Sequence, residues 1–123
     1  MSPRAAGATQ HELSRIGLLA SLPGETLARL AQNMTREEVA AGEQVVNEGD
    51  NGERFYVVLR GMLAVTQKDR GTQNVLRPGD YFGEVALAMH MPRTASVRAL
   101  TPATLASCDI DTFDQFLRPL FAD

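Results

Sequence analysis

The chain has 123 residues, a formal net charge of −3 and a single cysteine. This length fits one domain with one core and leaves no room for a second, catalytic domain. The negative charge argues against a nucleic-acid-binding surface, which needs a basic patch. The sequence has no apolar run of 18 residues and no signal-peptide core. We therefore expect no membrane contact by this domain itself and a cytoplasmic location, either alone or as the cytoplasmic part of a larger, even membrane-bound, protein.

The N-terminal third predicts a leader followed by two helices. Residues 1–10 are small and polar without periodicity, which indicates a flexible leader. Apolar residues recur every three or four positions over 11–34, which is helical spacing. Pro23 and Gly24 interrupt the pattern. Because proline is tolerated in a first helical turn, the second helix is predicted to begin there.

From residue 35 to 109 the pattern changes to short β-branched segments separated by glycine-containing turns. Strands with turns every 8 to 12 residues are typical of a β-sandwich or barrel. The turns at 41–43, 48–50 and 78–80 are assigned structural roles. We predict strands near Val39 and at 44–47, 55–60, 62–67, 74–76, 97–100 and 104–109.

The stretch 82–97, FGEVALAMHMPRTASV, concentrates the groups that could bind a ligand. Gly83 permits a sharp turn, Glu84 follows it, and a short helix-forming run ends at Pro92. One guanidinium and two hydroxyls, those of Arg93, Thr94 and Ser96, then return toward the acid. Amides at a helix start and an arginine suit a phosphate, and a carboxylate suits a ribose hydroxyl.

These residues also carry a resemblance to a known family. The runs 82–87 and 92–97 resemble the phosphate-binding cassette of cyclic nucleotide-binding domains, and the similarity extends over about residues 13–118. The family includes regulatory subunits of protein kinase A, cyclic-nucleotide-regulated channels and the catabolite activator protein. The resemblance implies a mainly β fold with flanking helices: an eight-stranded jelly-roll β-barrel, an N-terminal helical pair and a short cassette helix. Residues 11–123 then form a single cyclic nucleotide-binding domain.

The resemblance implies a role for each residue of the cassette. Arg93 is the expected phosphate partner, against the alternatives of an ion pair with Glu84 or a solvated arginine. Glu84 is expected to accept a hydrogen bond from the ribose 2′-hydroxyl, or else to serve only as a helix-start acid. The expected ligand-binding set is Gly83, Glu84, Val85, Ala86, Leu87, Arg93, Thr94, Ala95 and Ser96.

Thr94 bears on the choice of base. In the channels and cyclic-GMP kinases a hydroxyl at this position can meet the guanine 2-amino group, although a threonine here could also bond only its own backbone. Cyclic GMP should therefore be accepted. We rank cyclic AMP first, on the bacterial look of a chain with eleven arginines and the single Lys68. No cofactor is expected besides this ligand.

Residues 111–123 predict a C-terminal helix that starts at Asp111-Thr112 and is ended or kinked by Pro119. Domains of this family continue into a lid helix, so the lid is expected to be truncated here, either because the sequence is a piece of a longer protein or because something else caps the base. By resemblance, Leu87 packs against Phe113, or second Phe116, when ligand tightens the cassette. The expected output is an attached channel, kinase, transporter or transcription-factor domain.

The sequence gives little support to an enzymatic function. A cupin-type metal site needs several histidines, whereas this chain has only His11 and His90, so no metal site and no catalytic residues are expected. Cys108 is interpreted as a buried small hydrophobe rather than a reactive thiol. Two hypotheses remain: a regulatory module that binds cyclic nucleotide, and a scaffold domain that has lost the ligand. A sensor of another small anion is a third.

Overall fold

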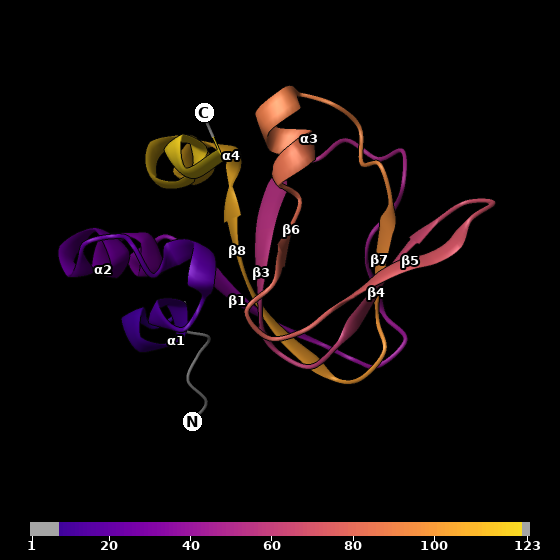
Figure 1. The fold of residues 1–123 in the computed structure, drawn as a ribbon, viewed down its shortest axis with the longest axis horizontal. Coiled ribbons are helices and arrows are strands. Elements are labelled where there is room, and N and C mark those ends of the chain that lie inside the picture. The colour runs from indigo at the N-terminus through magenta and orange to yellow at the C-terminus, as the bar shows by residue number, and fades with distance from the viewer. Residues whose placement is uncertain (1–7, 122–123) are drawn as a thin grey trace.

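A computed structural model describes residues 8–121 and shows eight strands flanked by helices (Figure 1). All strand pairs are antiparallel and form two four-stranded sheets, with the orders β1-β8-β3-β6 and β2-β7-β4-β5. This strand order is that of a jelly roll, so the predicted fold is confirmed. The strands are β1 (Thr35–Val39), β2 (Gln44–Val46), β3 (Arg54–Arg60), β4 (Leu63–Gln67), β5 (Gly71–Leu76), β6 (Tyr81–Phe82), β7 (Ser96–Ala99) and β8 (Ala103–Asp109).

Seven of these strands overlap the segments that the sequence predicts, and β6 is the one that it misses. With only two residues, Tyr81 and Phe82, β6 is too short to show an alternating pattern. It pairs with the middle of β3, where Phe82 lies opposite Tyr56. This pairing fixes the direction in which the chain enters the cassette.

The protein has two apolar clusters, one on each side of the first sheet. Alternate residues of β3 point to opposite faces: Phe55 and Val57 belong to the cluster under the helices, whereas Tyr56 and Val58 belong to the barrel interior. All four are buried, as are the residues of β8 from Ala103 to Cys108. Because helices cover the outer face, these two strands are buried on both faces over most of their length, rather than on alternate residues.

The N-terminal helices are α1 (Gln10–Ser14), a 3₁₀ turn η1 (Gly17–Leu19) and α2 (Gly24–Gln32), packed on the outer face of the first sheet (Figure 1). The predicted break is confirmed, with Pro23 as the residue that precedes α2. The predicted leader is too long at its end, because Ala8 is buried and the Thr9 side chain caps α1. The rest of that leader, residues 1–7, lies outside the described residues.

The C-terminal helical segment changes pitch twice. It runs from α4 (Ile110–Thr112) through a π-helical segment η2 (Phe113–Leu117) to a 3₁₀ turn η3 (Arg118–Phe121). The cap is Asp109, whose carboxylate accepts from the Thr112 amide at 2.9 Å, and not the predicted Asp111. The predicted start of this helix was two residues too late, because Asp109 and Asp111 satisfy the same capping rule equally well.

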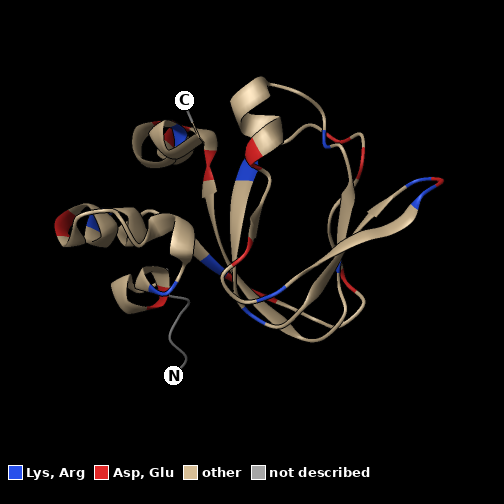
Figure 2. Ribbon diagram, in the orientation of Figure 1, with Lys and Arg blue, Asp and Glu red and all other residues tan. Residues whose placement is uncertain are grey.

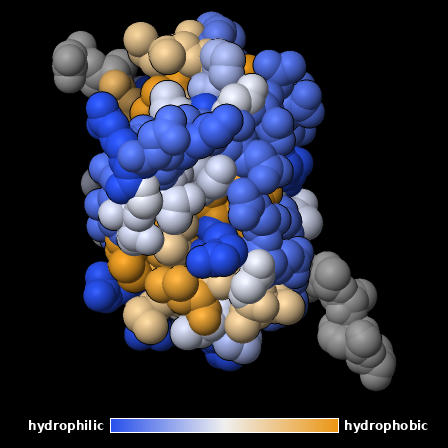
Figure 3. Space-filling model, turned by 90° about the vertical axis from the view of Figure 1, so that its right-hand side faces the viewer, coloured by the Kyte–Doolittle hydropathy of each residue, from blue (hydrophilic) through white to orange (hydrophobic). Residues whose placement is uncertain are grey.

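Charged residues are scattered over strands, turns and helices, and the start of α3 (Glu84–Met89) carries an acid (Figure 2). The surface seen from the side of β4, β5 and β7 is largely hydrophilic, with apolar areas toward its upper and lower ends (Figure 3). Over the described residues as a whole, the exposed large apolar side chains are Val85, Met89 and Met91 in the cassette and Met62 and Leu100 at two turns. Among residues 8–121, no helix is long and apolar enough to cross a membrane.

Candidate ligand-binding site

Gly83 sets the start of the cassette helix α3. Its φ of 99° is in the left-handed region, which favours glycine. A Cβ added there would lie 2.8 Å from the Arg54 carbonyl oxygen and 2.8 Å from Nη1 of Arg93. Both backbone conformation and space therefore require glycine, and its absent side chain lets α3 begin directly beside the arginine.

The end of α3 differs from the prediction. The helix ends at Met89, and His90 follows it in the left-handed conformation with φ 54°. Pro92 lies two residues further on and does not itself end the helix, because the Met91 amide has already turned back to the Ala86 carbonyl at 3.1 Å. His90 is exposed.

The first turn of α3 leaves amides for a ligand, but Leu87 does not contribute one. The N–H of Leu87 donates to the Gly83 carbonyl at 3.4 Å, which is the first bond of the helix. The amides of Glu84, Val85 and Ala86 precede that bond and have no partner further back in the helix. The amides at the helix start that remain for a ligand are therefore those of Ala86 and its predecessors.

Arg93 is the most unusual polar residue of the chain. Its side chain is buried, with 8% of the residue exposed, and its Nη2 donates to the Arg54 carbonyl at 2.8 Å. Nη1 is buried and has no hydrogen-bond partner within residues 8–121. Leaving a buried donor unpaired costs about 1–3 kcal/mol, and more for a charged group. Buried polar groups are nearly always paired, so an unpaired guanidinium nitrogen in a cavity points to a ligand.

The backbone around Arg93 holds the guanidinium in place. Its amide donates to the Asp50 carbonyl at 2.7 Å, and its carbonyl accepts from the Gly49 amide at 2.8 Å. The backbone at Gly52 lies close against both Ala86 and Arg93. A Cβ there would lie 2.2 Å from Cβ of Ala86 and 3.3 Å from Cζ of Arg93, so the close approach requires glycine. The turn at 48–50, which was predicted to have a structural role, thus forms the floor of the cassette.

The structure shows neither of the two alternatives that the sequence left open for Arg93, an ion pair with Glu84 or a solvated side chain. It is not solvated, and among the described residues no ion pair joins it to Glu84. Burial lowers the pKa of the Arg93 guanidinium, while the nearby Tyr56, Asp50 and Glu84 oppose that shift. Its Cζ lies 6.0 Å from the centre of the Tyr56 ring, a cation–π distance.

Glu84 is half-buried at the first position of α3. Burial raises the pKa of its carboxyl group, and its own backbone amide and the charge of Arg93 only partly offset that effect. The cavity thus holds a carboxylate and a guanidinium that are both desolvated and do not neutralise each other. A ligand with a negative phosphate and a neutral hydroxyl donor would satisfy both groups.

These groups face a cavity of about 230 Å³ between the cassette and the second sheet. Seven of the nine predicted ligand-binding residues line it, whereas two do not. The Leu87 side chain is fully buried in the helix-side core. The Ser96 hydroxyl accepts from the Glu48 amide at 2.9 Å and lines a separate surface hollow. The lining residues are Val46, Val65, Asn74, Leu76, Tyr81, Phe82, Gly83, Glu84, Val85, Ala86, Arg93, Thr94, Ala95 and Val97.

The sequence analysis did not predict the part of this lining that comes from β2, β4, β5, β6 and β7. The missed positions are Val46, Val65, Asn74, Leu76, Tyr81, Phe82 and Val97. No signal in the sequence marks Asn74, because it follows Thr72 and Gln73 in a run of exposed polar residues. Only the pairing of β5 with β4 brings it opposite Val65 and to the cavity.

The predicted switch residues share one cluster. Leu87, Phe113 and Phe116 all belong to the apolar core between the first sheet and the helices. Phe113 lies 5.4 Å from Phe55 and 5.7 Å from Phe121, ring centre to ring centre. This cluster joins the C-terminal segment to β3, next to the cassette.

Arg118 adds a polar link that the sequence reading did not identify. Its guanidinium donates to the carbonyls of Leu87 at 3.4 Å and Ala88 at 3.3 Å, and it lies 5.6 Å from the centre of the Phe113 ring. Asp114, one turn earlier, holds it at 2.8 Å. The C-terminal segment therefore caps the exposed carbonyl end of α3. Within residues 8–121, no group of three or more His, Cys, Asp or Glu side chains is placed to hold a metal ion.

Fold and cavity together define a jelly-roll module with a buried arginine beside a short helix, and Nη1 of that arginine has no partner among the described residues. The family model of the cyclic nucleotide-binding domain matches residues 36–119. The chain belongs to this family. The match favours a module that binds cyclic nucleotide over a scaffold domain without ligand.

Three known proteins illustrate the similarity. A cAMP-dependent protein kinase regulatory subunit of Eremothecium gossypii is 40% identical over 108 residues, which are 88% of this chain and 24% of that protein. The regulatory domain of Toxoplasma gondii PKA, crystallised with cAMP, shares the fold with a TM-score of 0.86 at 24% identity, over 90% of this chain and 44% of that one. The N-terminal domain of a Streptomyces coelicolor A3(2) transcriptional regulator has a TM-score of 0.75 at 30% identity, over 88% and 78%.

The chain spans about a quarter of the length of the curated relative it matches. The similarity therefore concerns one module of a larger kind of protein.

Proposed function

We propose that this chain binds a 3′,5′-cyclic nucleotide with the cyclic phosphate between Arg93 and the first-turn amides of α3. The observation that carries the proposal is the buried Nη1 of Arg93, which has no protein partner among the described residues. A phosphodiester oxygen supplies an acceptor of the right charge for a guanidinium. The helix start contributes unpaired N–H groups to the same anion.

We assign the ribose to Glu84 in the same pose. A carboxylate in a partly desolvated site gains from a hydroxyl that donates to it, because the bond replaces water that burial has removed. The ribose 2′-hydroxyl is such a donor. Ala95, which also lines the cavity, leaves space for the phosphate to approach the backbone.

The base end of the cavity favours adenine over guanine. Among the lining residues Asn74 is the only side-chain amide, and it lies between the apolar Val65 and Leu76. The Asn74 Oδ1 accepts from the Val75 amide at 2.9 Å and keeps a second lone pair, so the side chain still offers an acceptor and a donor. These match the 6-amino group and N7 of adenine, whereas guanine presents two acceptors on that edge. The Thr94 hydroxyl remains available to the guanine 2-amino group. We therefore rank cyclic AMP first and cyclic GMP second, in agreement with the name of the relative.

We further propose that the module is non-catalytic and acts in the cytoplasm. The described part of the chain, residues 8–121, forms one domain, and ligand changes how α3 meets the C-terminal segment. That change would control an attached or associated output, such as the catalytic subunit of a kinase, a channel, a transporter or a DNA-binding domain. A regulatory subunit and a transcriptional regulator among the similar proteins support this kind of role.

Calorimetric titration of the chain with cyclic AMP, cyclic GMP and 5′-AMP tests the proposal. We expect saturable binding of both cyclic nucleotides, cyclic AMP tighter, and none of 5′-AMP. Asn74→Val should reduce the preference for cyclic AMP by roughly tenfold, since a good bidentate base contact contributes about 1–3 kcal/mol. Binding of 5′-AMP or inorganic phosphate as tight as that of cyclic AMP would instead indicate a general anion sensor. Absence of any binding at millimolar ligand would overturn the proposal.

A further inference from the structure

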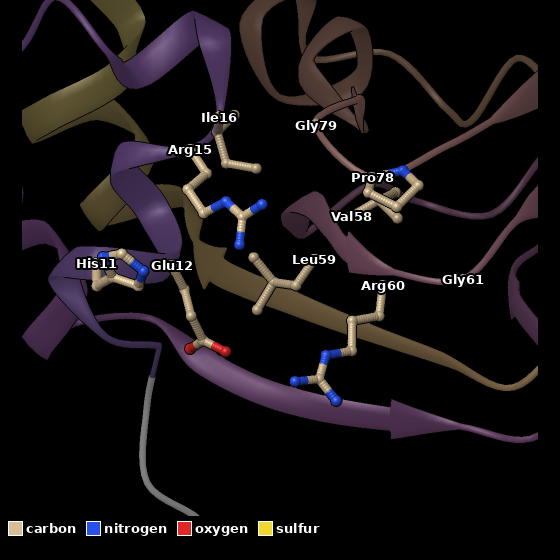
Figure 4. Close-up of a pocket in the computed structure, with 10 residues that line it drawn as sticks. All are labelled: His11, Glu12, Arg15, Ile16, Val58, Leu59, Arg60, Gly61, Pro78 and Gly79. Carbon is tan, nitrogen blue, oxygen red and sulfur yellow. The ribbon is translucent and has the colours of Figure 1, made fainter.

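A second and larger cavity lies away from the cassette, between α1 and the turns that follow β3 and β5 (Figure 4). Its volume is about 530 Å³, within the range of about 300–1,000 Å³ that small-molecule sites occupy. Nothing in the proposed cyclic nucleotide site uses it. Its lining residues are His11, Glu12, Arg15, Ile16, Val58, Leu59, Arg60, Gly61, Pro78 and Gly79.

Two arginines from distant parts of the chain share this cavity. Arg15 caps the C-terminal end of α1, and Arg60 is the last residue of β3. Both arginines are exposed, and Figure 4 shows their guanidinium groups on either side of Leu59. Within residues 8–121, neither side chain makes a hydrogen bond or an ion pair. Their donors are therefore available to a ligand.

The only carboxylate in the lining is already committed. Oε2 of Glu12 is 2.6 Å from Nη1 of Arg36, and its Oε1 accepts from the Thr9 amide at 3.1 Å. The hollow thus keeps the positive charge of both arginines. A cavity with two guanidinium groups and a neutralised acid attracts anions.

The apolar wall of the cavity is rigid. On the helix side of β3 the wall contains Ile16, which is almost fully buried with 2% exposed, whereas the Val58 side chain lies in the barrel interior on the other face of the strand. The backbone behind the wall is fixed by two bonds, from the Gly79 amide to the Val58 carbonyl at 2.9 Å and from the Val58 amide to the Asp80 carbonyl at 2.8 Å. The hollow is therefore preformed, and binding would mainly order the two arginine side chains.

We propose that this cavity is a second anion site, which takes a small phosphate-class anion such as a diphosphate group, with Arg15 and Arg60 each donating to its oxygens. Planar guanidinium forks suit phosphate oxygens, and two of them on opposite sides suit an anion with two charged ends. The bound anion joins α1 to the end of β3. It therefore stabilises the packing of the N-terminal helices against the barrel.

Titration of the ¹⁵N-labelled chain with inorganic diphosphate tests the proposal, with sodium chloride at matched ionic strength as the reference. We expect saturable shifts of the amides of Leu59, Gly61 and Gly79 that sodium chloride does not produce. Arg15→Gln and Arg60→Gln should each weaken the binding by roughly ten- to a hundredfold, as expected for the loss of a charge-assisted hydrogen bond. Arg70→Gln, at the exposed β4–β5 turn, is the matched control and should bind as the parent chain does.

The same spectra separate this site from the cassette. Shifts confined to Gly83 and Ala86 would place the diphosphate at Arg93 and overturn the second site. Non-saturating shifts, or equal loss of binding in Arg70→Gln, would reduce the effect to surface charge and also overturn it. Arg60→Lys guards against misfolding, since it keeps the charge but lacks the fork, and it should bind more weakly than the parent chain and more tightly than Arg60→Gln. Saturable shifts at the cavity would stand even if cyclic nucleotides did not bind.

Discussion

At the scale of single residues, Arg93 combines a cost to stability with a use in binding. Its guanidinium is buried with one nitrogen unpaired, a state that destabilises the free domain. A group retained at such a cost is expected to act on a ligand rather than on the fold. Affinity and stability should therefore respond in opposite directions when the charge is removed.

Arg93→Met checks this expectation, because methionine keeps apolar volume without the charge. We expect the affinity for cyclic AMP to fall by about two to three and a half decades, equivalent to the roughly 3–5 kcal/mol lost when a desolvated charge pair is broken. The free energy of unfolding of the ligand-free variant, measured in urea, should equal or exceed that of the parent chain. A variant that unfolds more easily but still binds cyclic AMP tightly would contradict the phosphate assignment.

Glu84 predicts a pH dependence of binding. Its carboxyl pKa is raised mainly by burial, above the usual 4.5. In the free domain this residue therefore contributes stability that is fully present below pH 4.5 and is lost as the pH rises through its folded pKa. Ligand reverses the preference, because a ribose hydroxyl donates to the ionised form and lowers the pKa in the complex.

Affinity for cyclic AMP should thus increase with pH from about 4.5 until Glu84 is fully ionised in the free domain, with release of a proton on binding. Calorimetry in buffers of different ionisation enthalpy measures that proton. Glu84→Gln should remove the pH dependence. If Glu84→Gln and the parent chain showed the same slope, another group would be responsible, and the ribose role of Glu84 would be withdrawn.

At the scale of elements, α3 depends on its neighbours. A helix of six residues is not stable alone in water, and its last carbonyls lack partners within the helix. Arg118 provides partners for two of them from the C-terminal segment and places a cation at the negative end of the helix dipole. Position and angle of α3 are therefore linked to the C-terminal segment by a side chain as well as by the apolar contacts of Leu87.

Arg118→Gln should weaken this link without removing the site. Because the side chain is one-third exposed, we expect a loss of about 1 kcal/mol, or roughly fivefold in affinity, seen mainly as faster dissociation of cyclic AMP. Stopped-flow displacement of a fluorescent analogue measures it. Asp114→Asn is the control, since it leaves the two carbonyl contacts possible. Equal dissociation rates for Arg118→Gln and the parent chain would mean that the apolar contacts alone couple the two elements.

At the scale of the whole molecule, β8 lies at the centre of both clusters and carries Cys108 toward the helices. The thiol is fully buried, and burial raises its pKa to about 12. It is therefore unreactive in the folded state, as the sequence reading expected, and reports on opening of the structure.

Labelling of Cys108 with a disulfide reagent should be negligible in buffer and rapid in denaturant. A ligand that binds only the folded state stabilises it by RT ln(1 + [L]/Kd), so cyclic AMP at 100 times its Kd should slow labelling about a hundredfold. 5′-AMP at the same concentration is the control. Labelling that is fast in buffer, or unaffected by cyclic AMP, would show that opening at β8 is independent of the ligand.

Much of this protein was decided locally. Helical spacing, β-branched segments and glycine turns predicted the N-terminal helices and seven strands, because such patterns depend on neighbours two to four residues away. The cassette was also predictable, since Gly83, Glu84 and Arg93 lie within eleven positions of one another. Family membership followed from the same residues.

Tertiary structure decided how these residues are used. Ser96 and Arg93 are three positions apart, yet pairing of β7 with β4 turns the Ser96 hydroxyl toward Glu48 while the loop at Asp50 and Gly52 buries Arg93. The roles of Asn74 and Arg118 likewise depend on segments far away in the chain. Their contacts come from strand register and helix packing, which are properties of the assembled core and leave no periodic mark on the sequence.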